Sequence, residues 1–252
     1  MKSVRTAVAG SALAIAMVPV TLAGCGSQPA TPAATPASTP TATAPASPGT
    51  TPAPPQTPGP GANAPTPSIR VVSSRLAYPW HWPNDPARPG RVAHSYPVPP
   101  IPGLVQISVG YHPVEHGQLP YNRMSFSFTQ AFPSYHFEWV SQLVSDASGK
   151  VVPLAGTDVL KVVFDQAQAH SADGTRSTIV SQPGRPIGYQ SMTDYAQAGD
   201  YEGVLTYGIG YTRAVPLSNP QTYVRAYEVE TVTAAGQHRY VVAIDIKAAQ
   251  HD

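Results

Sequence analysis

His112, Glu115 and His116 are the residues whose types and spacing come closest to known catalytic chemistry. They match the H-x-x-E-H order in which a helix holds two imidazoles against a zinc ion, with the glutamate beside a bound water. Pro113 follows the first histidine and Gly117 follows the last, and both residues disfavour the helix that this geometry needs. We therefore expect a solvated loop here, and no metal.

Other catalytic and nucleotide-binding motifs are missing from the sequence. It contains no G-x-S-x-G nucleophile turn, no G-x-x-x-x-G-K-[ST] phosphate loop and no G-x-G-x-x-G dinucleotide motif, so we expect no cofactor. Gly208 and Gly210 are two positions apart in a strand context, which indicates a bulge or the close approach of another segment. Asp200 and Glu202 form a carboxylate pair near a turn, where such residues are usually solvated or cap backbone amides.

One short stretch gathers residues suited to binding a ligand without catalysis: Tyr201, Tyr207, Tyr211 and Arg213. Flat aromatic rings with hydrogen-bonding neighbours suit a sugar surface, which needs no activated group. Tyr207 and Tyr211 are four residues apart, so they share one side of a regular strand, and Arg213 continues that side. We expect a binding face here. The alternative is that one or more of these tyrosines belongs to the core.

The elements that would position these residues are strands. Large apolar residues recur at every second position over residues 124–128, 135–139, 160–164 and 240–246. Gly, Asp and Pro residues typical of turns separate these runs, and the best candidate for a short helix is 191–198. Short strands joined by turns favour an all-β fold, an antiparallel β-sandwich, over a βαβ fold. We expect one such domain over residues 104–252.

Two segments of different composition precede this domain. Residues 68–103 carry Trp and Tyr among scattered prolines, which predicts an irregular arm whose aromatic rings pack on the domain. Residues 25–67 hold no charged residue and consist mainly of Pro, Thr and Ala, so they bury too little apolar surface to fold. We expect a disordered linker that reaches on the order of 100 Å, since a Pro-rich chain extends about 3.1 Å per residue.

The first residues have the layout of an exported protein. Lys2 and Arg5 precede an uncharged apolar run, residues 7–20, that is too short to span a bilayer. Residues 22–25 read L-A-G-C, which resembles the lipobox of bacterial lipoproteins. This resemblance implies cleavage after residue 24 and a lipid on Cys25 that anchors the chain to the outer face of the cell membrane. Because the sequence has one cysteine, the domain then contains no disulfide.

The charge balance argues against nucleic acid as a partner. Removal of residues 1–24 leaves 13 Lys and Arg against 14 Asp and Glu, a formal charge of −1. No basic run stands out, whereas a protein that binds nucleic acid neutralises phosphates with clustered Lys and Arg.

Stretches of the periodic part resemble the AMIN-like domain of actinobacterial lipoproteins. Residues 123–128 read R-M-S-F-S-F, residues 133–135 read P-S-Y and residues 152–156 read V-P-L-A-G, in the order of related family segments. Residues 201–210 read Y-E-G-V-L-T-Y-G-I-G and are similar to F-E-G-V-L-T-W-G-L-G in the family. The resemblance implies a β-sandwich over residues 106–246 that binds peptidoglycan or another envelope polymer, with no catalytic residues in the motif.

Together these patterns predict an exported lipoprotein whose β-sandwich binds a cell-envelope polymer or protein without catalysis. The first alternative is a small cell-wall hydrolase that uses His or carboxylate residues of the loops at 112–121 and 183–198, which depart from the family pattern. The second is a carrier of a lipid or glycolipid, which would need a large apolar cavity between the sheets.

Overall fold

The computed structural model describes residues 69–114, 117–213 and 221–248, and within them the regular elements are all strands. The strands are β1 (Arg70–His81), β2 (Arg91–Val92), β3 (Leu104–His112), β4 (Tyr121–Phe128), β5 (Ser134–Val140), β6 (Asp158–Asp165), β7 (Met192–Tyr201), β8 (Val204–Tyr211), β9 (Val224–Val232) and β10 (His238–Lys247). The expected signal peptide, Cys25 and the linker lie outside the described residues. In the described part of the chain, no helix is long and apolar enough to cross a membrane.

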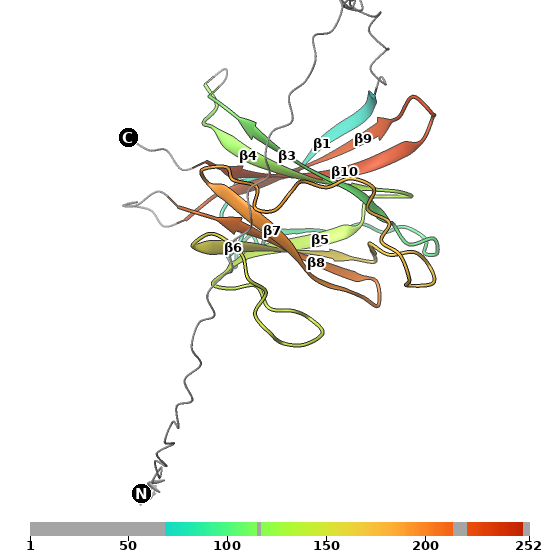
Figure 1. Ribbon diagram of the computed structural model, residues 1–252. Helices are drawn as coiled ribbons and strands as arrows, with labels where there is room; N and C mark the ends of the chain where they lie inside the picture. Colours follow the sequence, from blue (N-terminus) through green and yellow to red (C-terminus); the bar gives the residue numbers. More distant parts are fainter. Residues whose placement is uncertain (1–68, 115–116, 214–220, 249–252) are drawn as a thin grey trace, which may run out of the picture. The chain divides into compact units, whose positions relative to one another are not determined.

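The ten described strands form two antiparallel sheets that face each other, which confirms the predicted sandwich (Figure 1). Sheet A has the strand order β1-β9-β10-β4-β3, and sheet B has the order β2-β5-β6-β8-β7. In sheet A, Asp245 of β10 lies opposite Arg123 of β4 on one side and Arg225 of β9 on the other. Ile244 and Ile246 point into the core, so these three charged residues share the outer face of sheet A.

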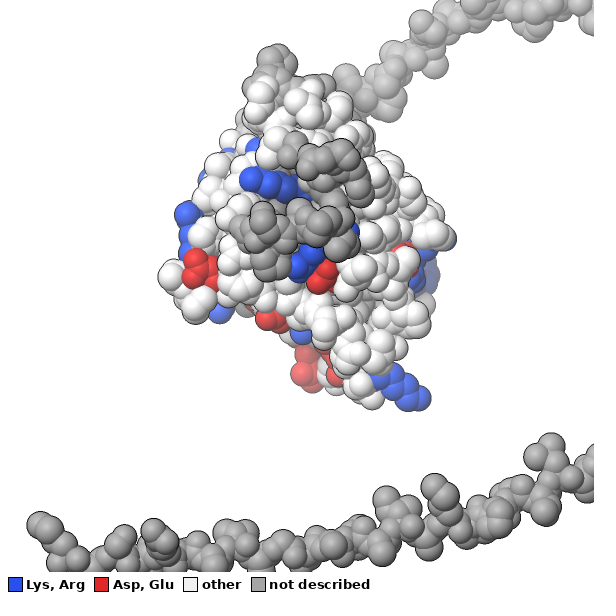
Figure 2. Space-filling view, turned by 90° about the vertical axis from the view of Figure 1, so that its left-hand side faces the viewer, with Lys and Arg blue, Asp and Glu red and all other residues white. Residues whose placement is uncertain are grey.

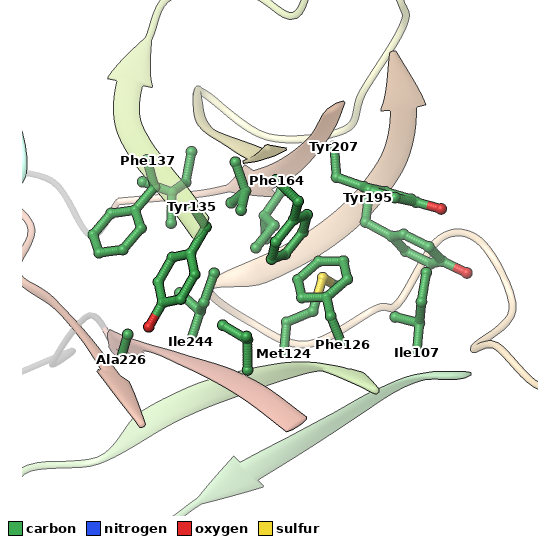
Figure 3. Packing of buried hydrophobic residues seen from close by; sticks show 14 of the residues in the cluster. Ile107, Met124, Phe126, Tyr135, Phe137, Phe164, Tyr195, Tyr207, Ala226 and Ile244 are labelled. Atoms are coloured by element: carbon green, nitrogen blue, oxygen red, sulfur yellow. The ribbon is translucent and has the colours of Figure 1, made fainter. Parts of the chain in front are cut away.

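Large apolar side chains fill the space between the two sheets (Figure 3). The ring centroid of Phe126 lies 5.0 Å from that of Phe164 and 5.3 Å from that of Tyr207, contacts that join β4 to β6 and β8. Met124 and Ile244 are fully buried in the same cluster. Phe126, Phe164 and Ile244 are apolar positions of the alternating runs, so the period of two correctly predicted which side faces the core.

Residues 69–103 are more regular than the irregular arm expected from the sequence. β1 pairs with β9 and β2 pairs with β5, so this segment adds an edge strand to each sheet. The predicted packing of aromatic rings is present, since Tyr78 is 3% exposed and lies against Phe137. The expectation of irregular structure is wrong for β1. Its Pro79 lies in an edge strand beside register shifts, where a missing amide hydrogen is tolerated.

The short helix considered for residues 191–198 is not formed. This stretch belongs to β7, which pairs with β8 and buries Met192 and Tyr195 on its inner side. Two register shifts, at 192–194 and 197–199, interrupt the pairing. Such bulges disturb the alternation of apolar and polar residues by which a strand is recognised in a sequence.

A loop covers the outer face of sheet B over β8. Leu143 packs so closely there that a Cβ on Gly208 would lie 2.6 Å from its Cδ2 atom. A Cβ on Gly210 would lie 2.1 Å from the carbonyl oxygen of Ala155. Close approach of another segment, one of the two reasons predicted for these glycines, is thus confirmed. Two of the stretches that carry the family resemblance, residues 152–156 and 201–210, therefore pack against each other.

Candidate binding face

The structure separates the four residues that the sequence predicted as one binding face. Tyr207 and Tyr211 are each 2% exposed, so the prediction of an open aromatic face is wrong for these two. Both tyrosines belong to the core cluster between the sheets, on the side of β8 that faces sheet A. Tyr201 is 72% exposed at the end of β7. Arg213 pairs with Asp158 at 2.9 Å.

A hollow of about 350 Å³ lies on the outer face of sheet A, and we call it the outer groove. Its lining includes Ser108 of β3, Ser125 and Ser127 of β4, Thr231 of β9, Arg239 and Val241 of β10, and Val180 from a neighbouring loop. Ser108 lies directly opposite Ser125 on neighbouring strands. Short side chains at these positions of β3 and β4 leave the sheet hollowed. Their hydroxyls can hydrogen-bond to a ligand that lies across the strands.

A row of three charged residues, Arg123, Asp245 and Arg225, crosses the same face of sheet A. Its member in β4, Arg123, lies two residues before Ser125. Asp245 accepts hydrogen bonds from Arg123 Nε at 2.6 Å, from Arg123 Nη2 at 2.9 Å and from Arg225 Nε at 2.6 Å. Asp245 is fully buried, whereas the Arg123 side chain is 28% exposed. Burial alone would lower the pKa of Arg123, but the hydrogen bond and negative charge of Asp245 raise this pKa above its ordinary value. Two guanidinium groups on one carboxylate give the row a formal charge of +1.

Aromatic rings surround the guanidinium group of Arg225. Its Cζ atom lies 4.5 Å from the ring centroid of Trp80, 4.6 Å from that of Tyr121 and 5.0 Å from that of Tyr227. The Nζ atom of Lys247 lies 5.5 Å from the Trp80 ring. These are cation–π contacts, which attract a desolvated cation. The cation–aromatic cluster, as we call it, consists of Trp80, Tyr121, Arg123, Arg225, Tyr227, Asp245 and Lys247.

The outer groove and the cation–aromatic cluster together form what we call the sheet A face. The groove offers hydroxyl donors and acceptors, and the cluster offers the partly exposed cations Arg123 and Lys247 and the ring of Trp80. Such a surface can hydrogen-bond polyols, stack on sugar rings and pair with anions. On the side drawn in Figure 2, the described surface is mostly uncharged, with small groups of Lys and Arg and of Asp and Glu.

Sequence reasoning missed the sheet A face, although the signal was present. Ser125 and Ser127 are the polar positions of one alternating run, and Asp245 and Lys247 are polar positions of another. The sequence does not show that these two runs are neighbouring strands. Their pairing follows from the strand order, which depends on contacts between residues far apart in the sequence.

The histidines of the H-x-x-E-H stretch show no arrangement for zinc in the described residues. His112 ends β3 and stacks on Tyr121, with ring centroids 4.4 Å apart. Glu115 and His116 lie outside the described residues. Among those that are described, no group of three or more His, Cys, Asp or Glu side chains is placed to hold a metal ion.

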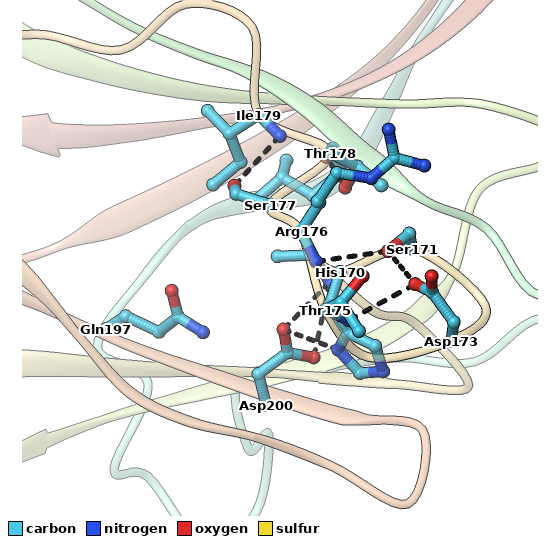
Figure 4. Close-up of polar contacts among 12 residues, drawn as sticks. His170, Ser171, Asp173, Thr175, Arg176, Ser177, Thr178, Ile179, Gln197 and Asp200 are labelled. Carbon is cyan, nitrogen blue, oxygen red and sulfur yellow. Dashed lines mark hydrogen bonds and ion pairs between the residues drawn. The ribbon is translucent and has the colours of Figure 1, made fainter.

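One His–Asp pair has the geometry of a catalytic dyad (Figure 4). His170 Nδ1 lies 2.8 Å from the carboxylate of Asp200, which also accepts hydrogen bonds from the amide of Ala169. The neighbouring hydroxyl of Ser171 donates to Asp173 at 2.5 Å rather than to the imidazole. The pair therefore ties its loop to β7 without an activated nucleophile at Ser171.

A further hollow, of about 490 Å³, is lined by residues 83–91 and by β5, and its lining includes Asp85 and Glu138. Asp85 accepts a hydrogen bond from the amide of Ala87 and lies 2.9 Å from His81 Nε2. The Ala87 hydrogen bond is the largest cause that holds the pKa of Asp85 below its ordinary value. A general acid needs a raised pKa, so Asp85 is unsuited to that role.

Comparison with known proteins identifies the family. The family model of the AMIN-like domain matches residues 104–247, more than half of the chain, and the chain therefore belongs to the AMIN-like domain family. No curated protein and no solved structure matches the chain. AMIN-like domains occur in exported proteins of the cell envelope and are generally binding domains, which points to a role in binding cell-wall components such as peptidoglycan.

Proposed function

We propose that this protein binds a polymer of the cell wall through the sheet A face, without catalysis. The observation that carries the proposal is the contrast between the two sheets. A loop packs on the outer face of sheet B over β8, whereas sheet A presents a groove of about 350 Å³ floored by Ser108 and Ser125. Sugar hydroxyls match the serine hydroxyls, and anionic substituents match the cations at the end of the groove.

The proposal includes export and a lipid anchor. The L-A-G-C stretch supports lipidation of Cys25, and the composition of residues 25–67 supports an extended linker. Acyl chains contribute roughly 0.8 kcal/mol per buried methylene, so more than one chain holds the protein on the membrane. The linker then lets the domain reach wall polymer on the order of 100 Å from the membrane.

The packing between the sheets favours this function over a lipid carrier. Phe126, Phe164 and Tyr207 lie in ring contact across the space that a carrier would keep open. A ligand on the outside of sheet A requires no change in this core.

Replacement of Ser125 tests the proposed face. Ser125→Glu fills the floor of the outer groove and adds a negative charge, so retention of the full chain by purified insoluble wall should fall about tenfold. This corresponds to the loss of about one hydrogen bond and the desolvation of a charge. Ser125→Thr keeps the hydroxyl in a strand and should retain the wild-type value.

Sedimentation with increasing amounts of wall measures both variants. Equal retention of wild type and Ser125→Glu, with both folded by circular dichroism, would contradict the placement of the polymer in the outer groove. The absence of retention by the wild type would contradict wall binding itself.

A further inference from the structure

A third hollow, of about 360 Å³, lies at the β7 edge of sheet B. Its polar lining comes from Gln182, Arg185, Tyr195, Gln197 and Tyr207, and we call it the tyrosine hollow. The rings of Tyr195 and Tyr207 lie beside each other in the core, with both hydroxyls directed to the same side (Figure 3). Tyr207 thus presents to a ligand the edge of its ring and its hydroxyl, rather than its flat face.

In the tyrosine hollow, both phenol hydroxyls already donate their hydrogen to groups of the protein. Their oxygens are therefore left to accept a hydrogen bond from a ligand. Tyr195 donates to the carbonyl oxygen of Pro183 at 2.7 Å, and Tyr207 donates to Gln197 Oε1 at 3.3 Å. Each phenol oxygen keeps a lone pair, and the amide nitrogen of Gln197 keeps its hydrogens. Burial is the main cause that raises the pKa of both tyrosines, so the two hydroxyls stay neutral at ordinary pH.

The cation in the lining of the tyrosine hollow is already neutralised. Arg185 donates from Nε and Nη2 to Asp194, each at 2.9 Å. The lining residues include no Asp or Glu. The hollow therefore presents neutral donors and acceptors, which suits an uncharged polar ligand better than an ion.

A short segment, residues 180–183, separates the tyrosine hollow from the outer groove. Val180 lines the groove, and Gln182 lines the hollow. The amide of Ile107 in β3 donates to the carbonyl oxygen of Ser181 at 3.0 Å, which fixes the segment to the edge of sheet A. Two residues of chain span about 7 Å, so these two lining residues of the groove and the hollow lie close together.

We infer that the tyrosine hollow is a subsite for one neutral sugar residue, a pyranose ring with hydroxyl or acetamido groups. The inference rests on the proposed function, because it takes the sugar to be part of the polymer in the outer groove. Sugar hydroxyls both donate and accept, as the phenol oxygens and amide groups of the hollow require. A volume of about 360 Å³ is near the lower end of small-molecule sites, about 300–1,000 Å³, and suits a single ring.

Removal of one hydroxyl tests this subsite. Tyr207→Phe keeps the ring in the core, so the Kd of the full chain for a soluble β-1,4-linked N-acetylglucosamine tetramer should rise about tenfold in calorimetric titration. Gln197→Ala, at an exposed position, removes the acceptor of the Tyr207 hydroxyl together with the amide group of the hollow, and should weaken binding similarly. Tyr201→Phe is the matched control, because Tyr201 is 72% exposed and does not line the hollow, and it should leave the Kd unchanged.

Two results would overturn the inference: no binding of the tetramer by the wild type, or equal binding by wild type, Tyr207→Phe and Gln197→Ala. Wall retention that depends on Ser125 combined with no tetramer binding would exclude the subsite and leave the proposed function standing. Tetramer binding that depends on Tyr207 with no wall retention would support the subsite and count against the proposed function.

Discussion

A chain that starts at residue 104, where the family match begins, is expected not to fold. Deletion removes β1 and β2, and with them two of the partners of Glu228, which is 2% exposed on β9 and also accepts a hydrogen bond from the hydroxyl of Tyr135. Arg75 Nη2 lies 2.5 Å and His94 Nε2 lies 2.7 Å from its carboxylate. Breaking a buried ion pair costs up to about 3–5 kcal/mol, although solvent reduces the share of Arg75, whose side chain is 61% exposed.

The deletion also removes Tyr78, whose ring centroid lies 5.1 Å from that of Phe137. Emptying the site of a large buried aromatic side chain costs about 3–5 kcal/mol. The two losses together approach the total stability of a domain, about 5–15 kcal/mol.

Urea unfolding followed by circular dichroism measures the result of this deletion. A chain that starts at residue 59 is the control, because it keeps all the described residues and should unfold in one cooperative transition. If the chain from residue 104 unfolded as cooperatively and at the same urea concentration, β1 and β2 would be dispensable attachments and not parts of the sandwich.

Asp245→Ala is expected to lower the free energy of unfolding by about 3–5 kcal/mol. The side chain of Asp245 is fully buried and that of Arg225 is 8% exposed, so the substitution leaves a buried guanidinium group without its carboxylate. The rings of Trp80 and Tyr121 remain, but a cation–π contact contributes about 2 kcal/mol even when desolvated. Chemical denaturation of the full chain measures the difference.

Asp158→Ala is the matched control for this prediction. Asp158 also pairs with an arginine, Arg213, but the two side chains are 26% and 23% exposed. Pairs that solvent reaches contribute about 0–1 kcal/mol, so the control should change stability little. If the two substitutions had equal effects, Asp245 would not be the centre that holds the cation–aromatic cluster together.

The fold could be predicted from the sequence because each of its main strands has one apolar side. Residues 124–128 and 135–139 alternate strictly, and their apolar positions form part of the core. β1 could not be recognised in the same way, because it is an edge strand whose first seven residues are exposed and therefore show no alternation. The prolines around it, which predicted irregular structure, are tolerated at a sheet edge.

The predicted binding face failed at β8 for a physical reason. Both sides of this strand are buried, since Tyr207 faces the core, and Thr206, on the other side, is 1% exposed. Alternation then no longer tells which residues face solvent. The sheet A face, in contrast, depends on cross-strand neighbours such as Arg123 and Asp245, which are 122 residues apart in the sequence.

Amide chemical-shift mapping of the full chain with soluble wall fragments tests the central claim most directly. If the polymer lies on the sheet A face, the largest shifts should fall on β3, β4 and β10, around Ser108, Ser125 and Val241. Shifts confined to the outer face of sheet B, or no shifts under conditions in which insoluble wall retains the protein, would contradict the account.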